Sequence, residues 1–220
     1  MINKINEYNV FFINLDRRTD RRKFMEDQFA KYSINATRMS AVDAQNLPEA
    51  VKDYYLEDFV VRWNTKIERK LGRIACYLSH KLVLEMALER NLDNVLIMED
   101  DCIILSDELV NLPTGADILY LGGLLWGDQH YSQMEWKSII GYKVATSFSY
   151  LIIGKEKIKY VYDKLMAGRS KTYDILLIDK IQKLGNSYIS NPPLCLPNLQ
   201  FDSDITFIDG KPKLYGNKFK

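Results

Sequence analysis

The chain has 220 residues, of which 47% are apolar and 27% are charged. This length and composition suit one globular α/β domain over residues 1–220. The net charge of +1 provides no overall field for attracting nucleic acid, so no nucleic-acid partner is expected. Three widely spaced cysteines without a CxxC pair, together with only two histidines, argue against a disulfide framework and against a His/Cys zinc site.

The sequence predicts neither a membrane span nor a cleaved leader. Its apolar runs stay shorter than the roughly 18 residues that a transmembrane helix needs. Residues 1–9 lack the pattern of a signal peptide. We therefore expect a cytoplasmic protein that is either soluble or peripheral to a membrane.

The first half of the chain predicts two strands with a helix between them. Residues 10–15 form a short apolar run that is typical of a buried strand. Thr19 can cap a helix that runs to residue 32. Residues 36–42 predict a second strand that ends before Asp43. Residues 45–69 predict an irregular or weakly helical segment, a candidate for a mobile flap.

The second half continues the alternation of strands and helices. Residues 72–91 predict the clearest helix, because Ala75, Leu78, Leu82 and Met86 recur at helical spacing. Strands are expected at 94–99, 103–105, 117–122 and 148–153, helices at 155–166 and 172–184, and a loop wrapped over the domain from residue 191. This alternation favours a mostly parallel sheet with helices on both faces.

An acidic triplet is the most informative local feature. Glu99, Asp100 and Asp101 directly follow the apolar run 95–98, which predicts a strand buried on both faces. Adjacent carboxylates repel one another unless a cation neutralises them. Mg²⁺ and Mn²⁺ bind through carboxylates and phosphate oxygens, and ligands of open α/β sheets lie at the carboxyl ends of strands. The triplet predicts a cation site for a phosphorylated ligand or, with equal weight, an acidic turn.

Other groups suit binding of a diphosphate. The basic segment at residues 17–23 begins a predicted helix, where arginines could meet phosphate; a solvated helix start is the simpler alternative. Gly72 and Arg73 offer another anion contact at the start of the long helix. His80 on that helix is more often a structural core residue than a ligand, and Cys76 is most simply a small core residue.

Acidic residues later in the chain are further candidates. Asp174, at the start of a predicted helix, could accept a proton from an incoming hydroxyl, with a helix-dipole role as the alternative. Asp202 and Asp204 could complete a metal shell or serve the acceptor, with turn formation as the alternative. Six aromatic residues suit stacking on sugar or base faces, although aromatic residues usually pack cores: Tyr54, Tyr55, Trp63, Trp126, Tyr131 and Trp136.

Six segments, in chain order, resemble glycosyltransferase family 25, which includes lipooligosaccharide transferases and procollagen galactosyltransferases. The segments are 12–22 (FINLDRRTDRR), 41–43 (AVD), 72–80 (GRIACYLSH), 95–101 (VLIMEDD), 173–174 (YD) and 203–205 (SDI). Together they span nearly the whole chain. One departure is that the family usually has an acidic or neutral residue where Arg73 stands.

The resemblance implies a GT-A-like fold, in which a Rossmann-type sheet binds a nucleotide sugar. It implies that the triplet is a DxD-like motif, in which Asp101 and Glu99 hold Mn²⁺ or Mg²⁺ on the diphosphate. Gly72 and His80 would lie near the donor. The nucleoside part of the donor would be bound by Asn14, Leu15, Arg17 and Asp43.

The function implied is inverting transfer of a hexose, galactose or glucose, from a UDP-sugar to a hydroxyl of a glycan, glycolipid or protein, as in lipopolysaccharide biosynthesis. Asp174 is the expected general base, because inverting enzymes of this fold tend to place it at a helix start facing the metal; Asp204 is the second choice. Two other classes stay open. One is a non-catalytic binding or adhesion module on the same scaffold, and the other is a Mg²⁺-dependent phosphotransferase.

Overall fold

The computed structural model describes residues 2–57, 66–123, 125–126, 135–139, 143–144, 146–167, 172–202, 204, 207–208 and 211–212. Residues 58–65 of the predicted flap, with Trp63, and the aromatic candidate Tyr131 lie outside the described residues. Across the described ranges, none of the helices is long and apolar enough to cross a membrane.

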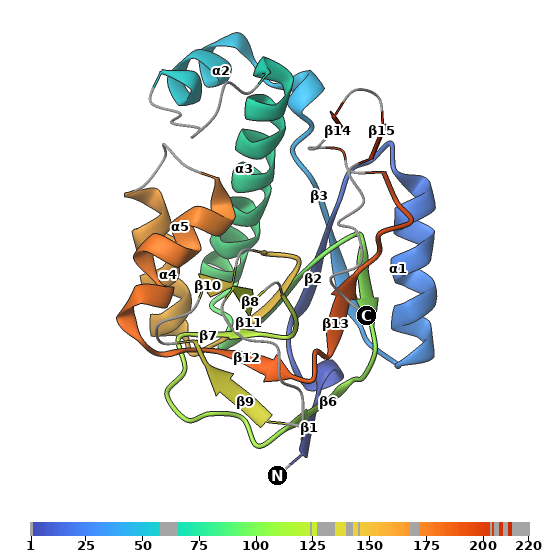
Figure 1. The fold of residues 1–220 in the computed structure, drawn as a ribbon, viewed down its shortest axis with the longest axis vertical. Helices are drawn as coiled ribbons and strands as arrows, with labels where there is room; N and C mark the ends of the chain where they lie inside the picture. Colours follow the sequence, from blue (N-terminus) through green and yellow to red (C-terminus); the bar gives the residue numbers. More distant parts are fainter. Residues whose placement is uncertain are drawn as a thin grey trace.

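A seven-stranded sheet forms the centre of the fold, in the order β3-β2-β4-β11-β7-β12-β9 (Figure 1). Its strands are β2 (Val10–Asn14), β3 (Ala36–Ser40), β4 (Asn94–Glu99), β7 (Ile118–Tyr120), β9 (Glu135–Ser138), β11 (Ser149–Ile153) and β12 (Ser187–Asn191). Five of the seven point in one direction, whereas β11 and β9 run antiparallel to their neighbours. The predicted α/β class with a mostly parallel sheet is therefore confirmed.

Helices cover both faces of the sheet, as predicted. Helix α1 (Thr19–Lys31) lies on one side, and α3 (Ile67–Glu89), α4 (Lys155–Met166) and α5 (Tyr173–Lys180) lie on the other (Figure 1). Helix α2 (Glu49–Leu56) packs near the amino-terminal end of α3. Within the described ranges there are also three 3-10 helices: η1 (Ile5–Glu7), η2 (Ala44–Asn46) and η3 (Gln182–Leu184).

Short antiparallel strand pairs tie loops and the tail to this framework. The pairs are β1 (Ile2–Lys4) with β6 (Glu108–Val110), β5 (Cys102–Ile104) with β13 (Cys195–Pro197), β8 (Leu125–Trp126) with β10 (Lys143–Val144), and β14 (Phe207–Ile208) with β15 (Lys211–Pro212). The β5–β13 pair matters most for the site. It fixes the tail beside the acidic triplet, because β5 begins directly after Asp101.

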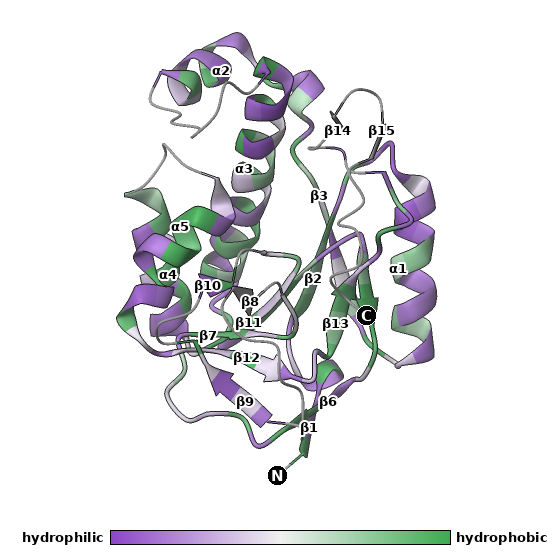
Figure 2. Cartoon of the chain, viewed as in Figure 1, coloured by the Kyte–Doolittle hydropathy of each residue, from purple (hydrophilic) through white to green (hydrophobic). Residues whose placement is uncertain are grey.

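Strands β2 and β4 are buried on both faces because their consecutive apolar residues alternate between two cores. Phe11 and Ile97 belong to the core that α3, α4 and α5 cover, whereas Phe12 and Met98 belong to the core beneath α1. Figure 2 shows the hydrophobic strands enclosed by helices whose outward sides are hydrophilic. In these two strands the polar side chains are therefore confined to the ends, where the site is built.

Three segments differ from the sequence expectations. Helix α3 begins at Ile67, before Gly72, because Leu71 packs against the same apolar cluster as Ile74. It ends near Asn91, whose φ of +53° is a left-handed terminating conformation. The predicted helix 172–184 divides into α5 and η3, where the side chain of Gln182 bonds backbone groups of a neighbouring strand. The tail is not only loop, because it contributes β13.

The close approach of the tail to β7 is testable at Gly122. A Cβ atom at Gly122 would lie 1.9 Å from the carbonyl oxygen of Cys195, which is backbone and cannot move aside. We expect Gly122→Ala to lower the free energy of unfolding, measured by urea denaturation, by about 3 kcal/mol. Gly115→Ala is the control, since its Cβ meets no atom within 4 Å and only the φ of +74° is strained, at a cost of about 1 kcal/mol. An equal loss in both variants would contradict the close approach.

Candidate functional site

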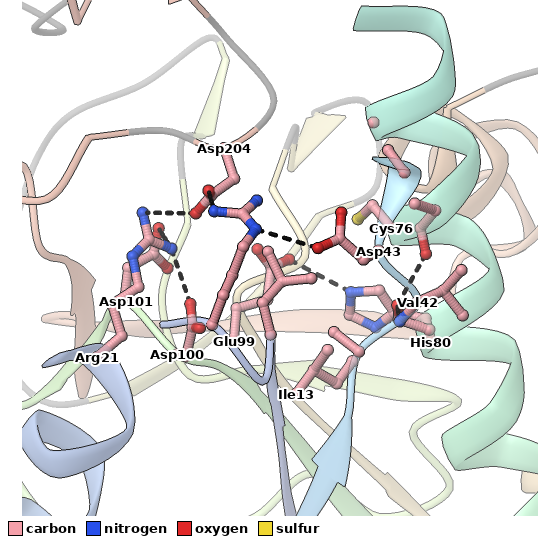
Figure 3. A pocket seen from close by; sticks show the side chains of 17 residues that line it. Ile13, Arg21, Val42, Asp43, Cys76, His80, Glu99, Asp100, Asp101 and Asp204 are labelled. Atoms are coloured by element: carbon pink, nitrogen blue, oxygen red, sulfur yellow. Dashed lines mark hydrogen bonds and ion pairs between the residues drawn. The ribbon is translucent and has the colours of Figure 1, made fainter. Parts of the chain in front are cut away.

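A pocket lies at the carboxyl ends of β2, β3 and β4, between α1 and α3 (Figure 3). These three strands point the same way, so residues far apart in the sequence meet at one edge of the sheet. Eight of the ten site residues expected from the sequence line this pocket: Leu15, Arg17, Asp43, Gly72, His80, Glu99, Asp101 and Asp204.

Asp100 is the member of the triplet that is fully paired. Its carboxylate accepts hydrogen bonds from Arg21 Nη1 at 2.7 Å and from Asn14 Nδ2 at 2.8 Å. Asn14 is 1% exposed, and it also donates to the Arg18 carbonyl and accepts from Arg38 Nε at 2.9 Å. Asn14 thus lies beneath the pocket and supports Asp100. The resemblance had placed it in the wall of the nucleoside pocket, but its amide is already engaged within the protein.

Glu99 is held in place by two neighbours. Its Oε1 accepts a hydrogen bond from Ser147 Oγ at 2.8 Å and lies 3.3 Å from His80 Nε2. Burial acts to raise the pKa of Glu99, but the hydrogen bonds from His80 and Ser147 outweigh burial and lower it. Glu99 is therefore ionised and oriented at the end of β4.

Asp101 is the triplet residue with spare capacity to bind. Burial, and then the negative charge of Glu99, raise the pKa of Asp101 to about 7. Arg21 Nη1 is 3.8 Å from Oδ2, too far for a hydrogen bond, and the buried Oδ1 has no hydrogen-bond partner among the described residues. A carboxylate in this state fits a hard cation, which accepts oxygen ligands and neutralises charge. Asp101 and Glu99 are the residues that could hold Mn²⁺ or Mg²⁺.

The carboxylate of Asp204 lies close to three arginines at and just before the start of α1. Arg17 Nη1 lies 2.8 Å from Oδ1, Arg18 Nη1 lies 2.7 Å from Oδ2, and Arg21 Nη2 lies 3.6 Å from Oδ2. The ring of Phe201 lies beneath two of these guanidinium groups, at 5.9 Å from Arg18 and 5.3 Å from Arg21. These contacts hold the tail against the start of α1. They also place Asp204 where it can orient the three arginines at the pocket.

The opposite wall of the pocket is formed by the segment after β3, which contacts Arg17, η2 and α3. Arg17 Nε donates to Asp43 Oδ2 at 3.0 Å, and the other oxygen of Asp43 caps η2 by accepting from Gln45 N at 3.0 Å. Val42 N donates to Ser79 Oγ of α3 at 2.9 Å. Gly72 of α3 also faces the pocket and presents no side chain there.

His80 is both a buried residue and a lining residue. Its ring is 1% exposed and stacks on Tyr173, with centroids 4.1 Å apart. Its Nδ1 lies 3.1 Å from Tyr150 Oη, which in turn bonds Tyr173 Oη. Cys76 lies one turn before it on the same helix and also lines the pocket. Burial, followed by the charges of Glu99, Asp174 and Asp101, raises the pKa of the Cys76 thiol.

Asp174 lies in the first turn of α5. Thr172 Oγ1 donates a hydrogen bond to Asp174 Oδ1. The charge of Asp174 contributes to the raised pKa values of Cys76 and of Tyr120, after burial in both cases. Asp174 is therefore near the α3 side of the pocket, although it is not among the residues that line it.

Four polar lining residues were not singled out individually as site residues from the sequence: Arg21, Cys76, Ser79 and Asp100. A signal existed for Arg21, which lies in the basic segment three residues after Arg18 at a helix start, and for Asp100 within the triplet. Ser79 carried no signal, because its role depends on a hydrogen bond from Val42, in the segment that follows β3. Cys76 was interpreted as a core residue, and only the packing of α3 against β4 shows that it reaches the pocket.

The fold and the site define a class of protein before any comparison. Five carboxylates line the pocket, against Arg17, Arg21 and the neighbouring Arg18, so an excess of negative charge is left for a cation. Cationic side chains at the same edge suit an anionic ligand. The arrangement is that of an α/β domain whose pocket could hold an anionic ligand together with a cation.

The chain belongs to glycosyltransferase family 25. The profile of "Glycosyltransferase family 25 (LPS biosynthesis protein)" matches residues 7–172. A "Glycosyltransferase 25 family member" of Drosophila melanogaster is 34% identical over 105 residues, and "Procollagen galactosyltransferase 2" of Mus musculus is 34% identical over 95 residues. An "Inactive glycosyltransferase 25 family member 3" of Homo sapiens is 33% identical over 106 residues.

These alignments cover 42–44% of this chain but only 15–17% of those relatives, so the chain corresponds to a small part of each. Among solved structures, the fold is similar to a glycosyltransferase involved in the glycosylation of the major capsid of PBCV-1. That similarity has a TM-score of 0.46 and 7% identity, over 89% of this chain and 94% of the other.

The raised pKa of Asp101 predicts how the stability of the metal-free protein depends on pH. The folded-state pKa of about 7 lies above the value near 4 of a free aspartate. The folded protein therefore keeps a proton that the unfolded chain releases, and the stability this provides is lost as the pH rises from about 4 through 7. In EDTA at pH 8, we expect Asp101→Asn to unfold with a free energy about 2 kcal/mol higher than wild type, and the difference to shrink toward pH 5.

Asp100→Asn is the matched control for that experiment. It removes the partner of the buried Arg21 guanidinium, so it should destabilise the protein by about 3 kcal/mol at pH 8. Chemical denaturation across the pH range measures both variants. A loss of stability on Asp101→Asn at pH 8 would contradict the assignment of Asp101 as the uncompensated carboxylate.

Proposed function

We propose that this protein is a metal-dependent, inverting glycosyltransferase that moves a hexose from a UDP-sugar to an acceptor hydroxyl. The observation that carries the proposal is the buried Oδ1 of Asp101, just after β4, which has no hydrogen-bond partner among the residues that the structure describes. Such an oxygen destabilises a protein interior unless it meets a cation or a donor. Membership of a glycosyltransferase family supports a donor diphosphate as the ligand that accompanies the cation.

On the donor side of the pocket, arginines near the start of α1 provide positive charge opposite the carboxylates. Mn²⁺ or Mg²⁺ at Asp101 and Glu99 would supply neutralisation of the charge on the leaving diphosphate. Arg17, whose side chain is 41% exposed, is the arginine most accessible to a phosphate oxygen. Asp204 holds Arg17 and Arg21 toward the same place. This geometry favours a role for Asp204 in orienting the arginines, and leaves the base to another residue.

We assign the general base to Asp174. In the proposed step, the carboxylate of Asp174 takes the proton of the acceptor hydroxyl while the acceptor oxygen forms a bond to the anomeric carbon. The bond from that carbon to the diphosphate breaks, and UDP leaves with the bonding electrons. Attack opposite the leaving group inverts the anomeric centre. The hydrogen bond from Thr172 fixes one oxygen of Asp174 and leaves the other for the proton.

Names of relatives guide the proposal for sugar and acceptor. The mouse relative is called a procollagen galactosyltransferase, and the family description refers to LPS biosynthesis. We therefore propose galactose or glucose as the hexose, and a hydroxyl of a glycan, glycolipid or protein as the acceptor. For a glycolipid acceptor, we propose that the protein is cytoplasmic and either soluble or peripheral to a membrane.

The rival function is a non-catalytic binding module on the same scaffold, because the human relative is described as inactive. Here Glu99, Asp101 and Asp174 are all present. A module without a cation would gain stability by losing the uncompensated carboxylate of Asp101. The retention of this carboxylate favours the enzyme.

A donor panel tests the proposed reaction. Purified protein is incubated with Mn²⁺, a set of UDP-sugars, and either a truncated lipooligosaccharide or a collagen-like peptide that carries hydroxylysine, and released UDP is measured. We expect release from UDP-galactose or UDP-glucose that needs one acceptor class and stops in EDTA. Phosphate release from simple phosphoesters, without preference for a nucleotide, would contradict sugar transfer and favour a phosphotransferase.

Asp174→Asn separates donor binding from the chemical step. We expect kcat for transfer to fall about 10³-fold, as expected for loss of a general base, whereas the Kd for the UDP-sugar changes less than about two-fold. Asp163→Asn, an exposed aspartate paired with Lys159 on α4, is the matched control and should retain wild-type turnover. Near-normal turnover of Asp174→Asn would place the base elsewhere.

A further inference from the structure

We propose that Cys76, His80 and Glu99 form a binding site for Zn²⁺ in the α3 wall of the pocket. Cys76 and His80 lie four residues apart on α3, and Glu99 ends β4 beside them. One ligand atom of each lies within 4.8 Å of the others. The small number of histidines and cysteines had argued against a His/Cys zinc site. A carboxylate from a different element now completes a mixed sulfur, nitrogen and oxygen set.

The distances suit one small ion after a modest movement. Zinc bonds of about 2.0–2.3 Å place the ligand atoms of a tetrahedral site roughly 3.4–3.8 Å apart. His80 Nε2 and Glu99 Oε1 are already 3.3 Å apart. The thiol of Cys76 lies within 4.8 Å of both other ligand atoms, so it has to approach by no more than about 1 Å. Cys76 is half-buried and lines the pocket, and its sulfur is visible beside His80 in Figure 3.

The neighbours of these ligands are arranged as outer-shell partners. His80 Nδ1 lies 3.1 Å from Tyr150 Oη, which directs Nε2 toward Glu99 and the pocket. Stacking on Tyr173 fixes the plane of the ring, and Ser147 holds the carboxylate of Glu99. Metal-ligating histidines usually bond through their second nitrogen in this way, which fixes ring orientation and tautomer. With zinc bound, Nδ1–H donates to Tyr150 Oη and Nε2 is left for the metal.

The chemistry of the ligand set favours a thiophilic ion. Thiolate and imidazole ligands select Zn²⁺ over Mg²⁺ and Mn²⁺, which prefer oxygen. Binding releases the thiol proton to solvent, so the charges of the thiolate and of Glu99 balance those of the ion. Three protein ligands leave the fourth position open to the pocket, as in zinc sites that accept a water molecule or a further ligand.

This site shares Glu99 with the proposed hard-cation site. Zn²⁺ would therefore inhibit transfer by withdrawing Glu99 from the donor cation. That consequence rests on the proposed function, whereas zinc binding itself does not.

Cobalt provides a test that is independent of activity. Co²⁺ accepts the same tetrahedral ligands as Zn²⁺ and reports a thiolate ligand by a near-ultraviolet charge-transfer band. In wild-type protein without nucleotide, we expect one equivalent of Co²⁺ to produce this band with the intense visible bands of a four-coordinate ion. Zn²⁺, but not Mg²⁺, should erase them. Cys76→Ser should abolish the charge-transfer band, and Tyr150→Phe should weaken Co²⁺ binding by about 10-fold or more.

The remaining thiols supply the matched control. Cys102 and Cys195 are fully buried in the core beneath α1, so Cys102→Ala should retain the band. Absence of the band in the wild-type chain overturns the proposal without any variant. A band that survives Cys76→Ser, or Cys76→Ala as the second replacement, overturns it as well. Because no UDP-sugar is present, failure of the transfer assay leaves this result unaffected.

Discussion

The ion pair between Asp100 and Arg21 is the interaction on which the site depends. Both side chains are almost fully buried, at 9% and 7% exposed, and Asn14 satisfies the second oxygen of Asp100. Without this pair, three consecutive carboxylates at the end of a buried strand would repel one another in a medium of low dielectric constant. Arg21 neutralises the charge of the Asp100 carboxylate. The other two are then free to face the pocket in different states, Glu99 hydrogen-bonded and Asp101 uncompensated.

Carboxylates and arginines also pair elsewhere along this edge of the sheet. Because β3, β2 and β4 are parallel, their carboxyl ends bring Asp43, the first-helix arginines and the triplet to one place. The tail supplies Asp204 as counter-charge to those arginines. The pocket thus has a hard, oxygen-rich side near α1 and a softer side near α3, where Cys76 and His80 lie. These two sides underlie the two cation sites that we propose.

Much of the fold was predictable from local pattern. Apolar runs identified β2 and β4, and helical spacing identified α3, because burial on fixed faces imposes those periods. The triplet and Arg17 were also predictable as parts of the pocket. Partners across the chain were not: Asp100 meets Arg21 from 79 residues away and Asp204 meets Arg18 from 186 residues away. Such pairs are set by packing. The resemblance therefore placed Asn14 in the wall of the nucleoside pocket, and helical spacing favoured a core position for Cys76. The structure shows Asn14 beneath Asp100 and Cys76 among the residues that line the pocket.

We propose that the uncompensated carboxylate of Asp101 binds a cation, and that this cation binds a nucleotide diphosphate. Calorimetric titration of UDP tests this directly. Wild-type protein, Asp101→Asn and the surface control Asp163→Asn are each titrated with and without Mn²⁺. We expect UDP to bind tightly only when both Mn²⁺ and Asp101 are present, and the control to behave as wild type. Equal affinity without the metal, or in folded Asp101→Asn, would contradict the proposal.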